Sequence, residues 1–444
     1  MYQGKLMRYF LLLLSIMLLA ACEPAAAQPT EAFPAETATR WFELELKLIR
    51  ETPGFTPPVA ARALGYSGVT LYEAVVGGMP ENNSLVGQVN GLTAMPQPDA
   101  DEAYYWPAVA NTALATILRE LFPTATPENL AAIDILEAEF AGQYRGETNQ
   151  QVYERSIAYG ESVAEVIFTW SMGDGGYEGY RRNFPANYAP AIGPGLWVPT
   201  PPGYQVTLQP YWGYVRPFVL DTDVECLAPP PTEYSEARDS AFYAEAMEVY
   251  TAVQELTPEQ EAIALFWADD PGTTFTPPGH SISIATIALR QEEASLAMAA
   301  ETYARVGMAV SDAFIGCWYA KYSYNLVRPI TFIQNIIDPA WNTPNITDPV
   351  ITPPFPEYTS GHSVQSGAAA ATLTALFGDD YAFTDDTHLN RGLAPRSFGS
   401  FYDFADEAAI SRLYGGIHYM PAIMLGVEQG NCIGEQINAL AWKK

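Results

Sequence analysis

The chain has 444 residues, of which 48% are hydrophobic, so it can bury a large core as two or three ordinary domains or as one large helical body. Its 22 Lys and Arg residues stand against 51 Asp and Glu residues, which gives a formal charge of −29 at pH 7. A surface this acidic excludes nucleic acid as a favourable partner, because phosphate contacts require a basic face.

The first 22 residues predict an export signal. Two basic residues precede an apolar stretch from Phe10 to Ala21, which is shorter than a typical membrane-spanning helix. This stretch ends in Leu-Ala-Ala-Cys, which resembles the processing box of bacterial lipoproteins. We therefore expect Cys22 to be lipidated and to anchor an exported protein to a membrane, on its periplasmic or cell-surface side. An ordinary signal peptide cut near Ala27 is the alternative.

The rest of the chain divides by composition into four segments. Residues 23–40 are rich in Ala, Pro, Thr and Glu and predict a flexible tether. Residues 41–172 have helical periodicity without strand-like alternation and predict an N-terminal helical region. Residues 173–233 are dense in Pro, Gly and aromatic residues, which favours a long ordered crossover that has room for a short hairpin. Residues 234–444 predict a helical domain that contains the active site, so the expected fold class is all-α, built of helical bundles.

Start signals and apolar periodicity place the elements of the C-terminal domain. Residues 257–260 have the sequence Thr-Pro-Glu-Gln, a capping box with Pro at the first helical position. Further helices are predicted over residues 281–324, 361–377, 407–414 and 421–442.

The three cysteines beyond the signal region allow at most one disulfide bond. An exported protein can form one, but the spacing of Cys226, Cys317 and Cys432 indicates neither a pairing nor a metal site. We expect buried free thiols that behave as small hydrophobic side chains.

Three short motifs in the last third of the chain supply reactive groups. Together they contribute three cations, a small hydroxyl, a glycine amide and two imidazoles, the groups that hold a tetrahedral oxyanion and act on it. One imidazole can bond to the central atom while the other moves protons near neutral pH. The motifs are Lys321-x6-Arg328-Pro329, Ser360-Gly361-His362 and Ser411-Arg412-x5-His418.

In this order and spacing, the motifs resemble the superfamily that unites vanadium-dependent haloperoxidases with type 2 phosphatidic acid phosphatases, over about residues 235–440. The resemblance implies a helical fold like that of vanadium chloroperoxidase. It implies that His418 coordinates vanadium in bound vanadate, or attacks phosphorus in a phosphatase, and that His362 transfers protons. Lys321 would also polarise the reacting oxygen. The oxyanion-binding residues that the resemblance implies are Lys321, Arg328, Ser360, Gly361 and Arg412.

The haloperoxidase branch matches at further positions. Trp318 and Phe355 correspond to aromatic residues near the halide in that branch. The segment Phe-Trp-Ala-Asp-Asp that ends at Asp270 resembles the one that supplies an acid to a site arginine, so the resemblance assigns this role to Asp270.

The chain departs from the family pattern at two positions. Thr359 replaces the proline before Ser-Gly-His, which we expect to alter loop stiffness rather than chemistry. Ala422 stands where the family often has an Asp that orients the second histidine. The partner of His418 is therefore open, with a backbone carbonyl or Glu428 as candidates.

Four other basic residues match nothing in the pattern. His280 and His388 are expected in loops, with a position of His280 near the site as the alternative. Arg391 and Arg396 are expected at the surface, or else at the entrance to the site.

The resemblance implies a vanadate-dependent haloperoxidase that uses hydrogen peroxide to oxidise a halide to hypohalous acid. The alternative is a phosphatase of soluble phosphate monoesters that acts through a phosphohistidine at His418 and needs no vanadate. A third hypothesis is a non-catalytic lipoprotein that binds an oxyanion, and Ala422 is its only support. The expected partners are peroxide and halide, or a phosphate ester, and a membrane through the lipid anchor.

Overall fold

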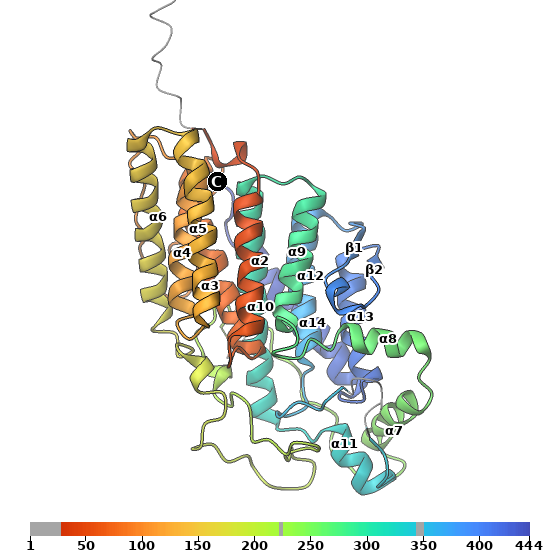
Figure 1. Cartoon of the computed structure of the whole chain (residues 1–444). Coiled ribbons are helices and arrows are strands. Elements are labelled where there is room, and N and C mark those ends of the chain that lie inside the picture. The colour runs from red at the N-terminus through yellow and green to blue at the C-terminus, as the bar shows by residue number, and fades with distance from the viewer. Residues whose placement is uncertain (1–27, 222–224, 343–349) are drawn as a thin grey trace, which may run out of the picture.

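The computed structural model describes residues 28–221, 225–342 and 350–444. Long helices run side by side through most of the molecule, and the loops of the crossover gather at one end of it (Figure 1). The helices are α2 (Glu36–Glu51), α3 (Pro57–Val75), α4 (Trp106–Leu121), α5 (Pro127–Glu147), α6 (Gln150–Ser171), α7 (Ala241–Gln254), α8 (Pro258–Phe266), α9 (Thr276–Gln291), α10 (Leu296–Tyr324), α11 (Pro329–Phe332), α12 (Gly361–Phe377), α13 (Phe401–Tyr414) and α14 (Met420–Asn438).

Two short strands, β1 (Phe383–Asp385) and β2 (Arg396–Phe398), form an antiparallel pair in which Phe383 lies opposite Phe398. The predicted all-α fold class is therefore confirmed, and the capping box of Thr257 and Gln260 is present at the start of α8. Within the described residues, no helix combines the length and the apolar character needed to cross a membrane. The remaining turns are η1 (Thr30–Ala32), η2 (Val76–Gly78), η3 (Gly179–Arg181), η4 (Trp212–Tyr214), η5 (Ile333–Ile337, a π-helical turn) and η6 (Leu389–Arg391).

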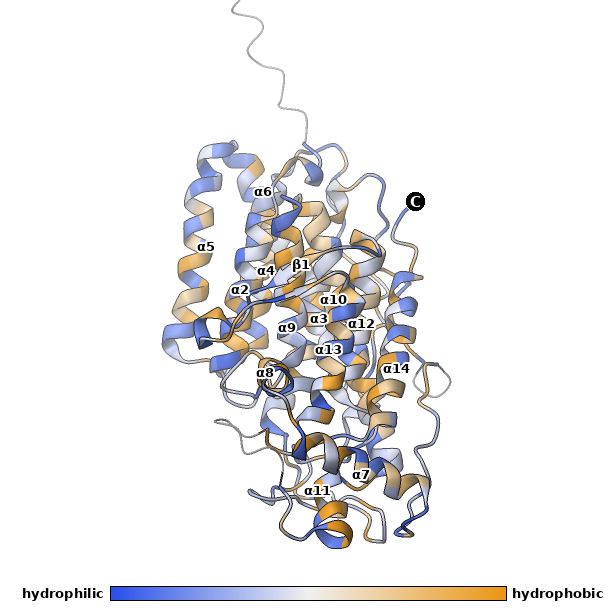
Figure 2. Cartoon of the chain, turned by 90° about the vertical axis from the view of Figure 1, so that its right-hand side faces the viewer, coloured by the Kyte–Doolittle hydropathy of each residue, from blue (hydrophilic) through white to orange (hydrophobic). Residues whose placement is uncertain are grey.

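Helix α10 is the central element of the fold. It packs against α3, α9, α12 and α14 and is buried almost all round, including the side chain of Lys321. The outer helix α5 instead buries only part of its surface, which includes Ile133 and Phe140, and hydrophilic and hydrophobic residues alternate along its length (Figure 2). Helix α10 ends at Asn325, whose backbone is left-handed (φ 49°) and whose N–H bonds to the Lys321 carbonyl.

The predicted flexible tether is wrong for its last part. Helix α2 already begins at Glu36, and Thr37, Ala38 and Thr39 are buried in it. Before it, the buried Thr30 hydroxyl donates to the Val75 carbonyl at 3.0 Å. Small side chains of this kind can pack closely against other helices, so their composition does not by itself indicate a linker. Cys22 and the export signal lie outside the described residues.

The crossover over residues 173–233 is fixed to α10 by a buried carboxylate. Asp312 accepts backbone N–H groups from Phe218 (2.7 Å), Val219 (2.9 Å) and Leu220 (3.3 Å). Burial raises the pKa of Asp312 to about 6, and the three hydrogen bonds oppose this shift. No hairpin occurs in the part of the crossover that the structure describes, where η3 and η4 are the regular elements.

The expectation of three free thiols is wrong for two of them. Cys226 in the crossover and Cys432 in α14 form a disulfide bond, with their Cα atoms 5.6 Å apart. Their separation of 206 positions along the chain gave no indication of this pairing, because only the fold brings α14 to the crossover. Cys317 is free and buried, as expected.

Glycines allow α3 and α10 to approach closely. A Cβ on Gly68 would lie 2.4 Å from the carbonyl oxygen of Tyr303, and a Cβ on Gly307 would lie 2.6 Å from that of Leu64. In both cases the neighbouring atom is backbone and cannot move aside. These glycines therefore set the spacing between the two helices.

We predict that Gly68→Ala lowers the free energy of unfolding by about 1–3 kcal/mol, because the new methyl group overpacks this contact. The control is Gly146→Ala in α5, where no atom lies within 4 Å of the added methyl group. It should stabilise the protein by roughly 0.5–1 kcal/mol, because alanine is the better helix former. Urea unfolding followed by circular dichroism measures both variants, and equal stabilities would contradict the close approach.

Candidate functional site

The predicted site residues meet at one cavity of about 630 Å³. Helices α10, α12 and α13 contribute to its wall, together with the segments that precede α9, α12 and α14. Lys321, Arg328 and Ser360 are fully buried beside these wall residues. The predicted residues in the wall itself are Asp270, Trp318, Phe355, Gly361, His362, Arg412 and His418.

His418 is held by a carboxylate that sequence reasoning missed. Its Nδ1 lies 2.7 Å from Oε1 of Glu357, which also accepts the backbone N–H of Tyr419 at 3.0 Å. Since the carboxylate oxygen accepts, His418 donates through Nδ1 and keeps a lone pair on Nε2. The guesses of a backbone carbonyl and of Glu428 are wrong, and Glu428 is exposed on α14. An acid inside the apolar, proline-rich run before Ser-Gly-His was the available signal.

Ala422 has a different task from the Asp of the family pattern. Its carbonyl oxygen accepts the backbone N–H of Ser360 at 3.0 Å and so ties α14 to the start of α12. The orienting carboxylate comes from Glu357, on the other side of the motif in the sequence.

The charges around His418 favour its neutral form. Burial and the neighbouring charges of Arg328 and Lys321 hold the pKa of His418 well below its usual value. Burial also raises the pKa of Glu357 to about 7, while Arg328 and Lys321 oppose this shift. Near neutral pH, His418 is therefore an uncharged imidazole whose Nε2 lone pair accepts the hydrogen bond from Arg328.

Arg328 has an unsatisfied donor at the site. Its Nη1 donates to the Ile417 carbonyl at 2.8 Å and to Nε2 of His418 at 3.1 Å, and its Nε donates to the Phe355 carbonyl at 2.9 Å. Its Nη2 is buried and has no hydrogen-bond partner among the described residues. A buried guanidinium N–H of this kind is suited to an anion.

Lys321 contributes its charge rather than a spare N–H. Its Nζ donates to the carbonyls of Pro356 (3.1 Å), Glu357 (2.9 Å) and Thr359. The ammonium lies 5.1 Å from the centre of the Phe355 ring, which faces the cavity. Burial lowers the pKa of Lys321 to about 8. The lysine thus holds the loop that contains Glu357 and places a positive charge beside the cavity.

Arg412 is the third buried cation. Its Nε donates to the Ser411 hydroxyl at 2.8 Å and its Nη2 to the Ala264 carbonyl at 3.2 Å. Burial lowers the pKa of Arg412 to about 10, and the charges of Asp270 and Asp269 oppose this shift. Asp270 therefore lies in electrostatic reach of the arginine to which the resemblance assigned it.

The start of α12 leaves room for a ligand. Ser360 caps this helix by accepting the backbone N–H of Ser363 at 3.4 Å. A Cβ on Gly361 would come no closer than 3.8 Å to its nearest neighbours, Phe314 and Trp318. Protein packing therefore does not demand glycine at position 361, whereas an anion at the helix start would use the vacant space and the exposed N–H.

His362 faces the cavity with an unsatisfied nitrogen. Its Nε2 is buried and has no partner in the described part of the chain, while its ring bonds to the backbone carbonyl of Trp267. Burial and the charge of Arg412 hold the pKa of His362 well below its usual value, against the opposing charge of Asp269. His362 is therefore neutral near pH 7 and can accept a proton.

Trp318 and Phe355 form an aromatic part of the wall, with ring centres 4.8 Å apart. The guanidinium of Arg328 lies 4.9 Å from the Phe355 ring centre, close to the ammonium of Lys321. An anion that contacts these aromatic rings would therefore also be attracted by the cations of Lys321 and Arg328 behind them.

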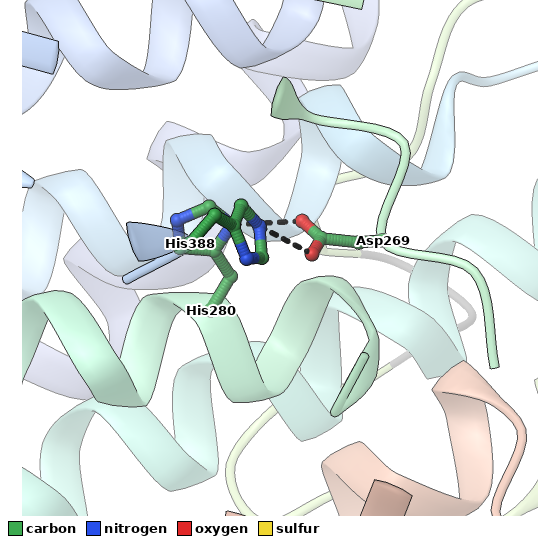
Figure 3. A group of neighbouring side chains, drawn as sticks. All are labelled: Asp269, His280 and His388. Carbon is green, nitrogen blue, oxygen red and sulfur yellow. Dashed lines mark hydrogen bonds and ion pairs between the residues drawn. The ribbon is translucent and has the colours of Figure 1, made fainter. Parts of the chain in front are cut away.

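The expectation of loop histidines is wrong for His280 and confirmed for His388, which lies in the turn before η6. His280 lies in the first turns of α9 and is buried, and His388 is buried beside it. Both contact the carboxylate of Asp269, which also lines the cavity (Figure 3). The polar run Thr-Pro-Pro-Gly-His resembled a loop, but its prolines lie at the helix start, where they are tolerated.

The two remaining arginines differ from each other. Arg391 lines the cavity, which was the alternative to a surface position. Arg396 lies on β2 and makes ion pairs with Glu407 and Glu259.

Comparison with known proteins identifies the family. A family profile for the second helical-bundle domain of vanadium chloroperoxidase matches residues 301–443. The vanadium chloroperoxidase of Curvularia inaequalis is 25% identical over 477 residues, which covers 85% of this chain and 78% of that protein. The structure described as the first bacterial vanadium-dependent iodoperoxidase is 39% identical, with a TM-score of 0.82 over 93% of this chain and 98% of that one.

A holo-type bacterial vanadium-dependent chloroperoxidase shares the fold at 18% identity, with a TM-score of 0.64 over 87% of this chain and 92% of that chain. Given the 39% identity over nearly the whole iodoperoxidase chain, this protein belongs to the vanadium-dependent haloperoxidase family.

We predict that Glu357→Gln weakens the binding of orthovanadate by about 10- to 100-fold, because the amide no longer favours the Nδ1–H form of His418. Isothermal titration calorimetry in phosphate-free buffer measures the dissociation constant. Glu428→Gln on the exposed side of α14 is the control and should bind as the unmodified protein does. Equal affinity in Glu357→Gln would contradict the role of this carboxylate.

Proposed function

We propose that the protein is a vanadate-dependent haloperoxidase that uses hydrogen peroxide to oxidise a halide. One observation supports this most directly: the neutral His418, which keeps a lone pair on Nε2, lies beside the unsatisfied, buried Nη2 of Arg328 at one cavity. Membership of the haloperoxidase family supports the same conclusion.

The residues present fit vanadate. His418 offers Nε2 to vanadium, and Arg328, Arg412 and the amide of Gly361 offer donors and space to the oxygens. Ser360 caps the same helix start, and Lys321 supplies charge without a spare N–H. When bound, vanadate supplies a Lewis acid that activates peroxide without a change in its own oxidation state.

The proton transfers fall to His362. As a neutral base at the cavity it accepts a proton from hydrogen peroxide through Nε2 and returns it as the product leaves. Arg412 keeps the imidazole neutral by electrostatic repulsion. We place the halide near Trp318 and Phe355, where the two aromatic rings exclude water and the buried cations offset negative charge.

The decisive experiment measures halogenation of a phenolic reporter with peroxide and iodide, bromide or chloride, after incubation with orthovanadate. We expect turnover that depends on vanadate. His362→Ala should lower it by about 10²- to 10⁴-fold, since a positioned general base contributes about that much. His418→Ala should abolish the dependence on vanadate, and Glu428→Gln should behave as the unmodified protein.

The same preparations are assayed with an aryl phosphate. Release of phosphate that vanadate inhibits, without halogenation, would replace the proposal by a phosphatase acting through His418. Binding of vanadate without either activity would indicate a non-catalytic oxyanion-binding protein.

We also propose that the chain is exported and lipidated at Cys22. The apolar stretch before Leu-Ala-Ala-Cys supports this. In a bacterial host that processes lipoproteins, labelled palmitate should be incorporated into the protein and not into Cys22→Ser. Equal labelling of both, or a soluble and unlabelled unmodified protein, would contradict the anchor.

A further inference from the structure

Four buried ionisable side chains lie together just behind the cavity. Asp269 precedes α9, His280 lies in α9, Asp385 ends β1, and His388 follows β1. Each is at most 1% exposed. The function proposed above assigns a task to none of them, although Asp269 lines the cavity. Buried ionisable groups this close to a cavity often support the function of the site.

His280 is hydrogen-bonded at both ring nitrogens. Its Nδ1 lies 2.8 Å from Oδ2 of Asp269, and its Nε2 lies 2.8 Å from Oδ2 of Asp385. A carboxylate accepts, so a ring between two carboxylates carries a proton on each nitrogen and is an imidazolium. Burial lowers the pKa of His280, but the two aspartates more than offset this and raise it to about 10.

The imidazolium of His280 therefore lies between two ionised aspartates. Burial alone would raise the pKa of Asp269, but His280 holds it well below the usual value. The pKa of Asp385 is also lowered, against the effect of its burial, by His280. Nε2 of His388 lies 3.1 Å from the other oxygen of Asp269, so this carboxylate is held between two imidazoles (Figure 3).

The segment 267–270 connects this cluster to the active site. The Trp267 ring stacks on His280, with centres 4.5 Å apart and an interplanar angle of 25°. The backbone carbonyl of the same Trp267 accepts the hydrogen bond of His362. At the other end of the segment, the charges of Asp269 and Asp270 act on Arg412. His280 thus contacts both ends of a short segment that touches two site residues.

We propose that His280 is a positioning residue for the haloperoxidase site: as a buried imidazolium between Asp269 and Asp385, it fixes the segment 267–270 and through Trp267 orients His362. The backbone of Asp269 is left-handed (φ 48°), a conformation that a non-glycine residue keeps only where its surroundings hold it. The hydrogen bond from His280 supplies that restraint, and His388 lies in contact with the other carboxylate oxygen.

The same residues could be considered as ligands of a divalent metal ion, since Asp269, His280 and His388 offer three buried ligand atoms within 4.8 Å of one another. A metal would require Nδ1 of His280 to lose its proton and the direct 2.8 Å contact to Asp269 to open. The direct contact therefore indicates a proton between Nδ1 of His280 and Asp269, and not a metal ion.

The first test does not depend on catalysis. The chain contains four histidines, so a protein labelled with ¹⁵N in its imidazole rings gives a simple spectrum, assigned with single-histidine variants. We expect one ring with two protonated nitrogens from pH 5.5 to 8.5. In His280→Gln this ring is lost and the resonances of His362 shift. A singly protonated His280, an unchanged His362 signal, or one bound divalent metal ion per chain by elemental analysis would overturn the proposal.

The second test uses the kinetics and rests on the proposed function. His280→Gln should lower kcat about 10- to 100-fold with a KM for peroxide within about threefold, because positioning of the base, not binding, is lost. The acidic limb of the pH profile should move up by about half to one pH unit, since the cation that lowers the pKa of His362 is gone.

Asp385→Asn removes a negative charge from the same ring and should move this limb the opposite way, to lower pH. The groups that act on His362 in either variant are Arg412, Asp269 and His280. Phe398→Leu, a buried aromatic near Trp267, is the control for a general loss of stability and should leave the pH profile unchanged.

The positioning role of His280 would be overturned if the acidic limb of the pH profile stayed in place, or if it moved in the same direction in His280→Gln and Asp385→Asn. An unmodified protein without turnover would instead refute the proposed function, and the imidazole spectrum would still decide the state of His280.

Discussion

Burial of three cations around one cavity is the constraint on which the site depends. Lys321, Arg328 and Arg412 are almost fully buried, and a buried charge is costly unless it is hydrogen-bonded or paired. Backbone carbonyls accept most of the hydrogen bonds that these cations donate, and Glu357 is the carboxylate close to two of them. Nη2 of Arg328 keeps an N–H at the cavity that no described residue accepts, and a bound oxyanion would accept it. In a chain with a formal charge of −29, three cations gathered at one cavity also favour an anion at this place.

The helices deliver these groups from their ends. Lys321 lies near the end of α10, Ser360 caps α12, Arg412 lies near the end of α13, and His418 directly precedes α14. Helix ends have unsatisfied backbone groups, and the start of a helix favours an anion. The close-packed helices therefore present these groups at the cavity from their ends, and the buried loop before α12 adds Glu357.

Two buried histidines show how neighbours decide the state of the same side chain. His418 has one carboxylate partner and two nearby cations, so it is neutral and keeps a lone pair. His280 lies between two carboxylates, so it is protonated on both nitrogens. The first arrangement suits a ligand to a metal, and the second suits a support that neutralises negative charge. The site thus contains an uncharged imidazole at His418, and the segment 267–270 connects the fixed ion cluster to His362.

The sequence alone determined the fold class and the residues that surround the oxyanion site, because helical periodicity is local and each motif has a fixed internal spacing. Only the tertiary structure decided the partners of these residues. Three contacts join segments that the sequence does not relate. They are the hydrogen bond between Glu357 and His418, the one between Asp269 and His280, and the disulfide bond between Cys226 and Cys432. A side chain's protonation and pairing depend on burial and on charges brought near by folding, and no spacing along the chain contains that information.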